Sequence, residues 1–428
     1  MVVSDTDGNL FELPPYLMTG MSIFAPGLPH LSELIELPYG SNVFMLPRRH
    51  PVGYDPRTSR FTTITEYEGN PVYAAAGFMA PAYMQLLRSA YDTLPGAERL
   101  PFYSYSALGW KQGKFFVSGV RVDDDQRQDL CHVDLPEIQK QAQWIKNKFK
   151  ANRLVQHLVD NCVCSYGCPA ARNFVMGRWE CPLPTSPTCN STCLGCISKQ
   201  PSSSRVVASQ DRIAFVPEVW EIAEIAVYHL RSAPRPVVSF GQGCEGEPLM
   251  YGDLLAEAVK EIRKHTDRGI INLNTNGSKP GKVQKLCEAG LDSIRVSLNS
   301  ARESFYTGYY KPRDYTFADV IASLGVIRDY NKWSSINYFI FPGFTDSTAE
   351  TEALFSLMVE SKINMIQTRN LNIDPEWYIG EMGLAGKSTI CTGLSAWLSR
   401  VQKELPWVKL GYFNPPRVEM NKLHFDFL

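Results

Sequence analysis

The spacing of hydrophobic residues changes character twice along this chain. Up to about residue 125, short runs rich in β-branched and aromatic residues alternate with turn residues, a pattern typical of β-strands. The runs cover residues 42–46, 60–67, 72–78, 102–110 and 115–122. Gly69-Asn70-Pro71 and Lys111-Gln112-Gly113 predict hairpin turns. We therefore expect a separate β-rich domain over residues 1–125.

This β-rich segment carries no catalytic motif but many aromatic side chains. They are Tyr39, Phe44, Tyr54, Tyr73, Phe78, Tyr83, Tyr103, Tyr105 and Trp110. The simpler interpretation is that they form core and packing surface. The alternative is a wall that closes over an active site or recognises a substrate.

Between residues 135 and 159, hydrophobic residues recur at three- and four-residue steps, which predicts a helix. Ile138, Ala142, Ile145 and Phe149 form its apolar stripe, and the lysines of this segment fall mostly off it. A solvated helix face explains these lysines better than a nucleic-acid site does. Residues 126–176 are expected to be a helical linker that ends in a cysteine-rich segment.

Strand and helix patterns alternate regularly from residue 177 onward. The predicted strands cover residues 177–181, 236–240, 270–273, 293–298, 336–341 and 363–369. Asp253 is expected to cap one helix, Gly290 to end another, and Ser347 with Glu350 to form a capping box. The alternation predicts a parallel sheet, either doubly wound or closed as a barrel. In both architectures ligands bind at the carboxyl ends of the strands.

Composition narrows the class of protein only slightly. The 428 residues are 44% hydrophobic and 20% charged, with a formal net charge of -1, so no electrostatic argument favours nucleic acid or a membrane as partner. No apolar run is long enough to span a bilayer, and the first residues do not form a secretory signal. We expect a cytoplasmic protein of more than one domain.

Cysteine changes the picture much more. Seven of the 11 cysteines fall between Cys162 and Cys196, a clustering that favours metal over disulfides in a large cytoplasmic chain. Cys189, Cys193 and Cys196 follow a C-x3-C-x2-C spacing on a loop rich in proline and small polar residues. Three such thiolates can hold three corners of an iron–sulfur cube and leave the fourth iron open. The alternative is a zinc site, which needs a fourth ligand and usually a second C-x2-C pair.

This spacing resembles that of the radical S-adenosylmethionine (radical SAM) superfamily. In that family a Gly-Gly-Glu-Pro stretch after the second strand holds the amino group of the cofactor, and Gly246, Glu247 and Pro248 match it. Two positions depart from the family pattern. Glu245 replaces the first glycine of that stretch, and Gly195 stands where an aromatic residue commonly precedes the third cysteine.

Two further motifs follow in the family's order, so the resemblance covers residues 178–374. Asn276 lies in a Thr-Asn-Gly turn after the third strand, and Ser297 and Asn299 on the fourth strand are the candidates for contacting the carboxylate and ribose of the cofactor. The loops at residues 341–346 and 367–374 resemble family loops around the adenine and the substrate. The expected fold is a partial (β/α)6 barrel over residues 177–380, closed by a C-terminal element over residues 381–428.

The resemblance implies an oxygen-sensitive enzyme with a 4Fe-4S cluster bound by Cys189, Cys193 and Cys196. S-adenosyl-L-methionine would bind the open iron, and a low-potential electron donor of the flavodoxin or ferredoxin type would supply the electron. The product is a 5′-deoxyadenosyl radical that abstracts hydrogen from a substrate. No motif identifies that substrate.

The upstream cysteines leave the number of clusters open. Cys162, Cys164, Cys168 and Cys181 are candidates for a second iron–sulfur cluster, and the alternative is that they are buried structural thiols. Lipoyl synthase has auxiliary ligands in a similar place, but its spacing is absent here. Cys244 is a weak candidate for an auxiliary ligand or a catalytic hydrogen-atom donor. The rival functions are therefore sulfur insertion from a sacrificial cluster and a non-catalytic metal-binding scaffold.

Overall fold

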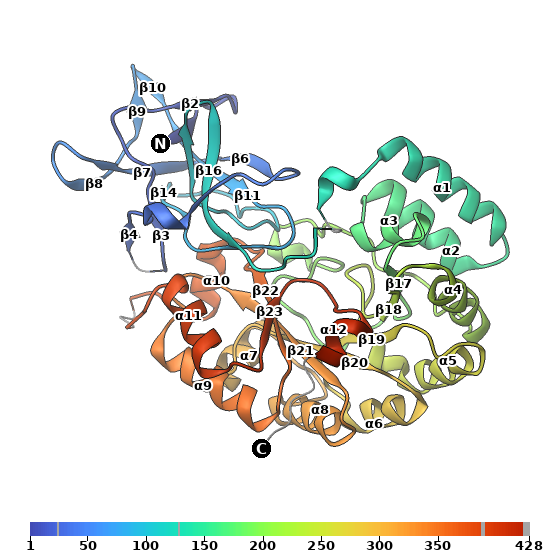
Figure 1. Cartoon of the computed structure of the whole chain (residues 1–428). Helices are drawn as coiled ribbons and strands as arrows, with labels where there is room; N and C mark the ends of the chain where they lie inside the picture. The colour runs from blue at the N-terminus through green and yellow to red at the C-terminus, as the bar shows by residue number, and fades with distance from the viewer. Residues whose placement is uncertain (24, 127–128, 387–389, 423–428) are drawn as a thin grey trace.

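The protein consists of a β-rich N-terminal unit seated on a larger α/β body (Figure 1). The computed structural model describes residues 1–23, 25–126, 129–386 and 390–422. Of the predicted C-terminal element, residues 423–428 and 387–389 lie outside the described residues.

The N-terminal unit is built from short antiparallel strands. One sheet runs in the order β2 (Leu10–Glu12), β1 (Val2–Ser4), β11 (Tyr73–Phe78), β6 (Asn42–Leu46). A second contains β12 (Tyr83–Gln85), β16 (Lys114–Arg121), β15 (Leu108–Lys111) and β5 (Leu34–Glu36). The remaining strands are β3 (Gly20–Met21), β4 (Pro26–Gly27), β7 (Arg49–Asp55), β8 (Arg60–Thr63), β9 (Glu66–Tyr67), β10 (Asn70–Pro71), β13 (Arg88–Ser89) and β14 (Tyr91–Thr93).

Most of the predicted runs in this unit become strands. Both predicted hairpins form, but the first turns at Glu68-Gly69, and Asn70 and Pro71 belong to β10. The run at residues 60–67 is divided between β8 and β9, and in the run at 102–110 only the last residues join a strand. Of the aromatic residues, Tyr105 is buried as core, whereas Tyr39 is 76% and Trp110 37% exposed. The interpretation as core and packing surface therefore holds for Tyr105 but does not account for the exposed side chains of Tyr39 and Trp110.

The helical linker is not one continuous helix. After η3 (Leu130–His132), α1 (Leu135–Lys148) ends, and Asn152 starts α2 (Arg153–His157) by accepting a 3.1 Å hydrogen bond from the backbone N of Val155. The prediction of a single helix over residues 135–159 was wrong because the Asn152 side chain caps a new one. The chain continues as a π-helical turn, η4 (Leu158–Ser165), and as α3 (Pro169–Val175).

The α/β body is organised by a parallel sheet of seven strands in chain order. They are β17 (Glu180–Leu183), β18 (Val237–Phe240), β19 (Ile270–Thr275), β20 (Ser293–Leu298), β21 (Trp333–Ile340), β22 (Met365–Asn370) and β23 (Lys409–Gly411). The predicted series had six strands, and the seventh comes from the C-terminal element, which pairs parallel with β22. Because each neighbour follows the last in sequence, the sheet curves as a partial barrel.

Helices cover the outer side of this curved sheet, as Figure 1 shows. They are α4 (Val219–Ser232), α5 (Gly252–His265), α6 (Pro280–Ala289), α7 (Glu303–Tyr310), α8 (Phe317–Asp329), α9 (Thr348–Glu360), α10 (Pro375–Glu381) and α11 (Leu394–Glu404). The last helix, α12 (Arg417–Lys422), instead packs through Met420 against the first residues of β18, β19, β21 and β22. Short 3-10 turns occur at η1 (Leu31–Glu33), η5 (Ser202–Ser204) and η6 (Pro248–Tyr251). The main hydrophobic core lies between these helices and the strands and extends into α1.

Two predicted helix caps were wrong, and one predicted helix end is confirmed. Asp253 lies inside the first turn of α5, where Lys282 and Lys285 bind its carboxylate. Ser347 does precede α9, but its side chain makes no capping hydrogen bond. Glu350 instead turns toward the end of β20. Gly290 ends α6 in a left-handed conformation, as expected.

Polar contacts lock the N-terminal unit onto the barrel. Arg49 pairs with Asp374 at 3.2 Å, and both side chains are almost wholly buried. Asn370, at the end of β22, accepts from the backbone N of Gln85 at 2.8 Å and donates to the carbonyl of Tyr83 at 3.1 Å. The unit is therefore fixed over the carboxyl ends of the strands.

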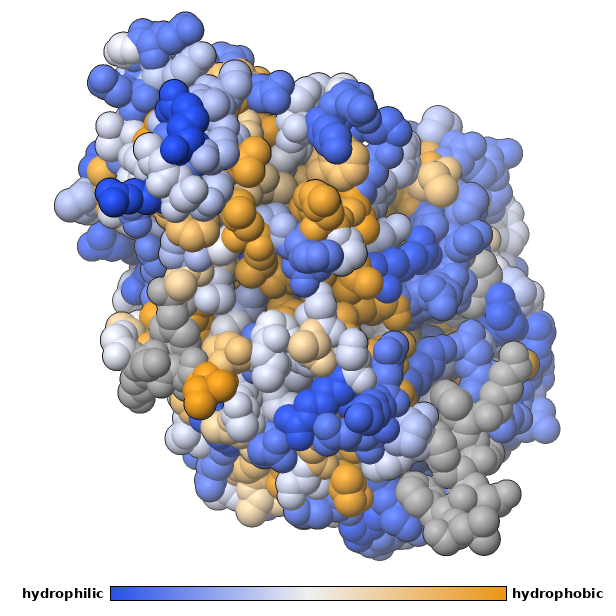
Figure 2. Space-filling view, turned by 60° about the vertical axis from the view of Figure 1, so that its left-hand side comes forward, coloured by the Kyte–Doolittle hydropathy of each residue, from blue (hydrophilic) through white to orange (hydrophobic). Residues whose placement is uncertain are grey.

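On the face seen in Figure 2, hydrophobic side chains gather toward the upper middle, and hydrophilic side chains surround them. Within the described ranges, no helix combines the length and the hydrophobicity that crossing a bilayer requires.

Candidate active site

A cavity of about 820 Å³ opens at the carboxyl ends of the parallel strands. Its floor is formed by the loops after β17, β18 and β19 and by side chains of β20, β21 and β22. Its roof includes Phe78, Pro81, Tyr83 and Phe102 of the N-terminal unit. Phe78 and Tyr83 thus form part of a wall over the cavity, the alternative that the sequence left open.

The three cysteines of the C-x3-C-x2-C loop line this cavity. Two backbone bonds fix their loop to α7, from the N of Thr192 to the O of Tyr310 at 3.1 Å and from the N of Leu194 to the O of Tyr309 at 3.0 Å. Burial raises the pKa of the Cys189 thiol to about 11 and also raises the pKa of the Cys193 thiol well above its ordinary value. Stable thiolates here would need a positive charge such as iron supplies.

The spacing of these sulfurs does not suit a single ion. They do not form a group whose ligand atoms all lie within 4.8 Å of one another, as the donors of one metal ion do. Ligands on three different irons of a cluster stand farther apart, because the cluster separates them. The arrangement therefore fits an iron–sulfur cube better than a mononuclear zinc site.

Gly195 is explained by a residue from α7. A Cβ atom at Gly195 would lie 2.5 Å from the hydroxyl of Tyr309, a distance that real Cβ atoms do not adopt. Tyr309 itself lines the cavity. The aromatic side chain that the sequence lacks beside the third cysteine is supplied from α7, and a larger residue at position 195 would collide with it.

Glu245 has a structural role that the sequence did not reveal. Its buried carboxylate accepts from the backbone N of Thr185 at 2.7 Å, of Ser186 at 2.9 Å and of Gln242 at 2.7 Å. It therefore ties the loop after β17 to the loop after β18. The backbone at residue 245 does not adopt a positive φ, so no glycine is required there.

Glu247 lies at the centre of the polar network beneath the cavity. Its carboxylate accepts from Thr275 Oγ1, from the backbone N of Asn276 at 2.8 Å and from the backbone N of Leu249 at 3.0 Å. A carboxylate has about four acceptor sites, so one remains, and Glu247 lines the cavity. Burial raises its pKa to about 7. The neighbouring Gly246 is required because a Cβ there would overlap the carbonyl of Thr188.

The other predicted cofactor-binding residues divide into two groups. Asn276, Ser297 and Pro248 line the cavity, and Asn276 Nδ2 also donates to Asn190 in the cysteine loop at 2.9 Å. Asn299 does not line the cavity. Its amide donates to the carbonyl of Phe305 at 3.0 Å, and its Oδ1 is buried without a partner among the described residues.

Two arginines on the cavity wall were missed as functional candidates. Arg295 Nη1 and Arg369 Nη2 both donate to Gln367 Oε1, at 2.9 and 3.3 Å. Burial, and secondarily the charge of Arg369, lowers the pKa of Arg295 to about 9. Arg295 and Ser297 are two residues apart on β20 and so share a face, but only the pairing of β20 through β21 with β22 brings Arg369 beside Arg295.

A second cavity of about 580 Å³ reaches the same cysteines from the outside. Basic side chains dominate its charged lining: Arg99, Lys199, Arg212, Lys311 and Arg313, with Glu381. Arg212 lies close to the sulfur of Cys196, with 3.6 Å between Nη2 and Sγ. The cysteine loop thus lines both cavities, the larger of which we call the inner chamber and the smaller the outer groove.

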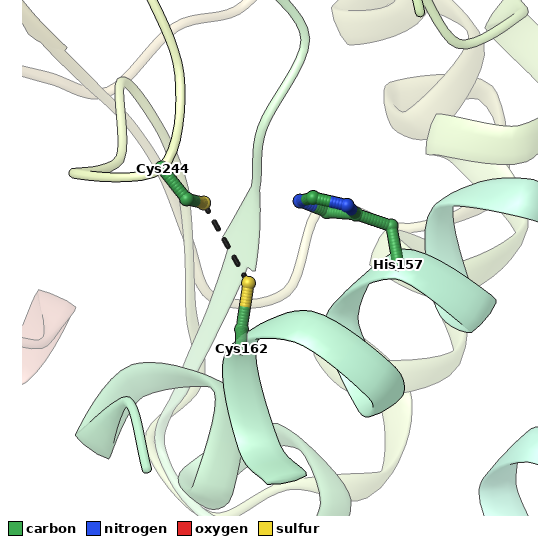
Figure 3. Close-up of side chains that lie close together, drawn as sticks. All are labelled: His157, Cys162 and Cys244. Carbon is green, nitrogen blue, oxygen red and sulfur yellow. Dashed lines mark hydrogen bonds between the residues drawn. The ribbon is translucent and has the colours of Figure 1, made fainter. Parts of the chain in front are cut away.

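The upstream cysteines differ in their exposure to solvent. Cys164 is exposed, Cys168 is partly exposed and Cys181 is fully buried in β17. Cys162 instead faces Cys244, with 3.6 Å between the two sulfurs, and their hydrogen bond lowers the pKa of Cys162 to about 5. Figure 3 shows His157 beside this pair.

Together, the fold and the site define a class: a parallel α/β partial barrel with a three-cysteine loop and an acidic loop at the carboxyl ends of its first two strands. The family model described as the Radical SAM superfamily matches residues 183–355. The chain therefore carries a radical SAM domain, as the sequence predicted. The comparison with curated protein sequences returned no match.

Solved structures align with this chain at low identity and with TM-scores below 0.5. Native anSMEcpe with bound AdoMet is 16% identical over 44% of this chain and 51% of that chain, with a TM-score of 0.34. SuiB of Streptococcus suis bound to S-adenosylmethionine is 16% identical over 66% and 67%, with a TM-score of 0.37. HydG, a maturase of the [FeFe]-hydrogenase, is 12% identical over 68% and 66%, with a TM-score of 0.39. The first of these is therefore matched over only about half of its length.

Proposed function

We propose that the protein is a radical SAM enzyme whose 4Fe-4S cluster is bound by Cys189, Cys193 and Cys196. The observation that carries this proposal is that the cysteine loop and the Glu247 loop line one cavity at the carboxyl ends of the strands. When bound, the cluster and S-adenosylmethionine supply one-electron cleavage to a 5′-deoxyadenosyl radical that abstracts hydrogen from the substrate.

The chain's own residues bind and orient the cofactor. Glu247 uses its remaining acceptor site for the amino group of S-adenosylmethionine, and Ser297 donates its hydroxyl, which makes no hydrogen bond within the described part of the protein. Asn276 fixes the third loop to the cysteine loop. Asn299 acts from outside the cavity, by holding the end of β20 to Phe305.

The roof and the arginine pair point to the class of substrate. Side chains of the N-terminal unit cover the chamber and exclude water, which protects a radical from quenching. Arg295 and Arg369 present guanidinium groups to the same space and have no carboxylate partner among their hydrogen bonds. A substrate with a carboxylate or phosphate group would satisfy them.

The outer groove suits the delivery of electrons. Five basic side chains line it next to the cysteine loop, and an acidic flavodoxin or ferredoxin would be attracted to such a surface. Electrons would enter from this side, while the substrate occupies the inner chamber.

The test is cofactor cleavage by anaerobically reconstituted protein. With dithionite, the wild-type protein should convert S-adenosylmethionine to 5′-deoxyadenosine, with about four irons and four sulfides per chain. Replacing Cys189, Cys193 and Cys196 with Ala should abolish both iron binding and cleavage. The control is Cys164→Ala, which removes an exposed cysteine of the upstream segment. Cleavage that survives loss of the three cysteines would refute the ligand assignment.

A further inference from the structure

A second metal-binding arrangement lies behind the cofactor loop. Of the described His, Cys, Asp and Glu side chains, one group of three has ligand atoms that all lie within 4.8 Å of one another: His157, Cys162 and Cys244. His157 ends α2, Cys162 lies in η4, and Cys244 lies in the loop after β18. Two consecutive helical segments and a loop that is distant from them in sequence thus bring their side chains to one point.

The π-helical winding of η4 creates half of this arrangement. His157 and Cys162 are five residues apart, a separation that an α-helix would turn to different faces. A π-helix closes i to i+5 hydrogen bonds, and the backbone N of Tyr166 donates to the O of Asn161 at 3.1 Å in that pattern. The wider turn places His157 and Cys162 on the same side of the helix.

The other half comes from the backbone around Cys244. The N of Ile213 donates to the O of Cys244 at 2.8 Å, and the buried carboxylate of Glu245 fixes the next residue. Both sulfurs are nearly inaccessible, with Cys162 2% and Cys244 4% exposed. Figure 3 shows the edge of the His157 ring facing both sulfurs. His157 Nε2 is buried and has no hydrogen-bond partner among the described residues.

The distance between the two sulfurs distinguishes a disulfide, a single metal ion and an iron–sulfur cluster. A disulfide would bring them to about 2.05 Å, far below the 3.6 Å that separates them. Two thiolates on one tetrahedral zinc, each bound at about 2.3 Å, stand about 3.8 Å apart. In a 4Fe-4S cluster each thiolate binds a different iron, and such ligands would be farther apart still. The observed separation therefore matches a single ion.

We propose that His157, Cys162 and Cys244 form a mononuclear site for a zinc-type divalent ion, separate from the cysteine loop. Two thiolates and one imidazole are a donor set that zinc favours over magnesium or calcium. Binding releases the thiol protons to solvent and involves no change in oxidation state. A fourth position is left for water, since the converging group does not include Cys168.

Such an ion would fasten the linker to the cofactor loop. Cys162 belongs to the linker, and Cys244 stands three residues before Glu247. The predicted auxiliary set of Cys162, Cys164, Cys168 and Cys181 is thereby replaced by a site that shares only Cys162 with it. The role we assign to the ion is structural, since the Cys162 and Cys244 side chains lie outside the inner chamber.

Cobalt binding tests the site without interference from iron. The protein used is the full chain with Cys189, Cys193 and Cys196 replaced by Ala. Added Co²⁺ should give thiolate-to-cobalt charge-transfer bands and intense visible bands of a tetrahedral site, saturating at one ion per chain and displaced by Zn²⁺. Adding Cys162→Ser or Cys244→Ser should remove the charge-transfer bands. His157→Ala should weaken binding by about 10-fold or more, since even outer-shell partners contribute that much.

The matched controls are Cys164→Ser, an exposed thiol two residues from Cys162, and Cys287→Ser, a buried thiol on α6. Equal loss of the bands in these controls, or no thiolate bands in the parent protein, would overturn the proposal. So would iron and sulfide beyond one cluster in reconstituted wild-type protein that disappear with Cys162→Ser, because the site would then hold a cluster.

A measurement on the wild-type chain covers the case in which the variants do not fold. In the absence of denaturant, Zn²⁺ should slow the alkylation of Cys162 and Cys244 and leave the alkylation of the exposed Cys131 unaffected. Peptide mapping of the alkylated protein measures the extent of reaction at each cysteine. Equal alkylation with and without Zn²⁺, or a Cys162–Cys244 disulfide that persists in place of metal uptake, would contradict the mononuclear site.

Discussion

The hydroxyl of Tyr309 lies 2.5 Å from the position that a Cβ atom would occupy on Gly195. Tyr309 belongs to α7, more than a hundred residues beyond the cysteine loop, and it fills the space next to the third cysteine. The loop and α7 are therefore complementary in shape, and each constrains what the other can carry.

This complementarity predicts a suppressor relationship. Gly195→Ala should lower the stability of the loop by about 1–3 kcal/mol, the usual cost of overpacking, and should reduce iron incorporation. Tyr309→Phe removes the colliding oxygen and leaves the ring carbon that carried it 3.5 Å from the new Cβ, an ordinary contact. The double variant should therefore recover iron content, measured after reconstitution. If the double variant is no better than Gly195→Ala alone, the collision is not the reason for glycine.

A second prediction concerns Glu350 on α9. Its fully buried carboxylate accepts from Ser300 Oγ at 2.7 Å, from the N of Ala301 at 2.8 Å, from Arg302 Nε at 2.7 Å and from Tyr338 Oη at 2.6 Å. Glu350→Ala should lower the free energy of unfolding by about 3–5 kcal/mol, because it leaves buried donors and a charge unpaired. Chemical denaturation measures this directly.

Comparing the stability losses of Glu350→Ala and Ser347→Ala distinguishes this buried network from the predicted capping box. Ser347→Ala should cost only about 1 kcal/mol, since its hydroxyl makes one bond, to the carbonyl of Phe344 at 2.7 Å. Glu352→Ala on the same helix is the surface control and should cost about 0–1 kcal/mol. Similar small losses for Glu350 and Ser347 would instead support the capping box.

A third prediction tests how the roof is attached. Arg49→Met leaves the carboxylate of Asp374 buried without its cation, and should destabilise the native state by about 3–5 kcal/mol. Because the pair joins the N-terminal unit to the residue that caps α10, protease cleavage in the linker should accelerate before global unfolding. Lys114→Met breaks the exposed pair with Glu36 in the same unit and should cost about 0–1 kcal/mol. Identical proteolysis of the two variants would show that the Arg49 pair does not hold the roof.

The parts of the site that follow from local sequence were predicted well. The alternation of strands and helices, the order of the loops and the position of the cysteine loop after the first parallel strand all depend on short stretches of sequence. Carboxyl ends of parallel strands meet at one edge, so Cys189 and Glu247 could be brought together without coordinates.

The parts that depend on long-range packing could not be predicted. Nothing near Gly195 indicates Tyr309, and nothing in β22 alone places Arg369 beside Arg295. The seventh strand was missed because β23 is three residues long and pairs only after the C-terminal element returns to the sheet. The position of Glu350 fits the capping-box pattern, but its carboxylate instead accepts hydrogen bonds from buried donors that include Arg302 and Tyr338.

The last prediction follows from the burial of Glu247. Burial disfavours the ionised carboxylate and raises its pKa to about 7, so in this environment the group is mostly protonated at pH 6 and mostly ionised at pH 8. Only the ionised form can accept from the ammonium group of S-adenosylmethionine with full charge. Binding should therefore tighten as the pH rises through about 7, when measured by anaerobic calorimetry on reconstituted protein. Glu247→Gln keeps the shape of the side chain but cannot titrate, so its binding should be weaker and independent of pH over this range. A wild-type affinity that is also flat from pH 6 to pH 8 would remove Glu247 from the cofactor site and leave it with the purely structural role of joining Thr275, Asn276 and Leu249.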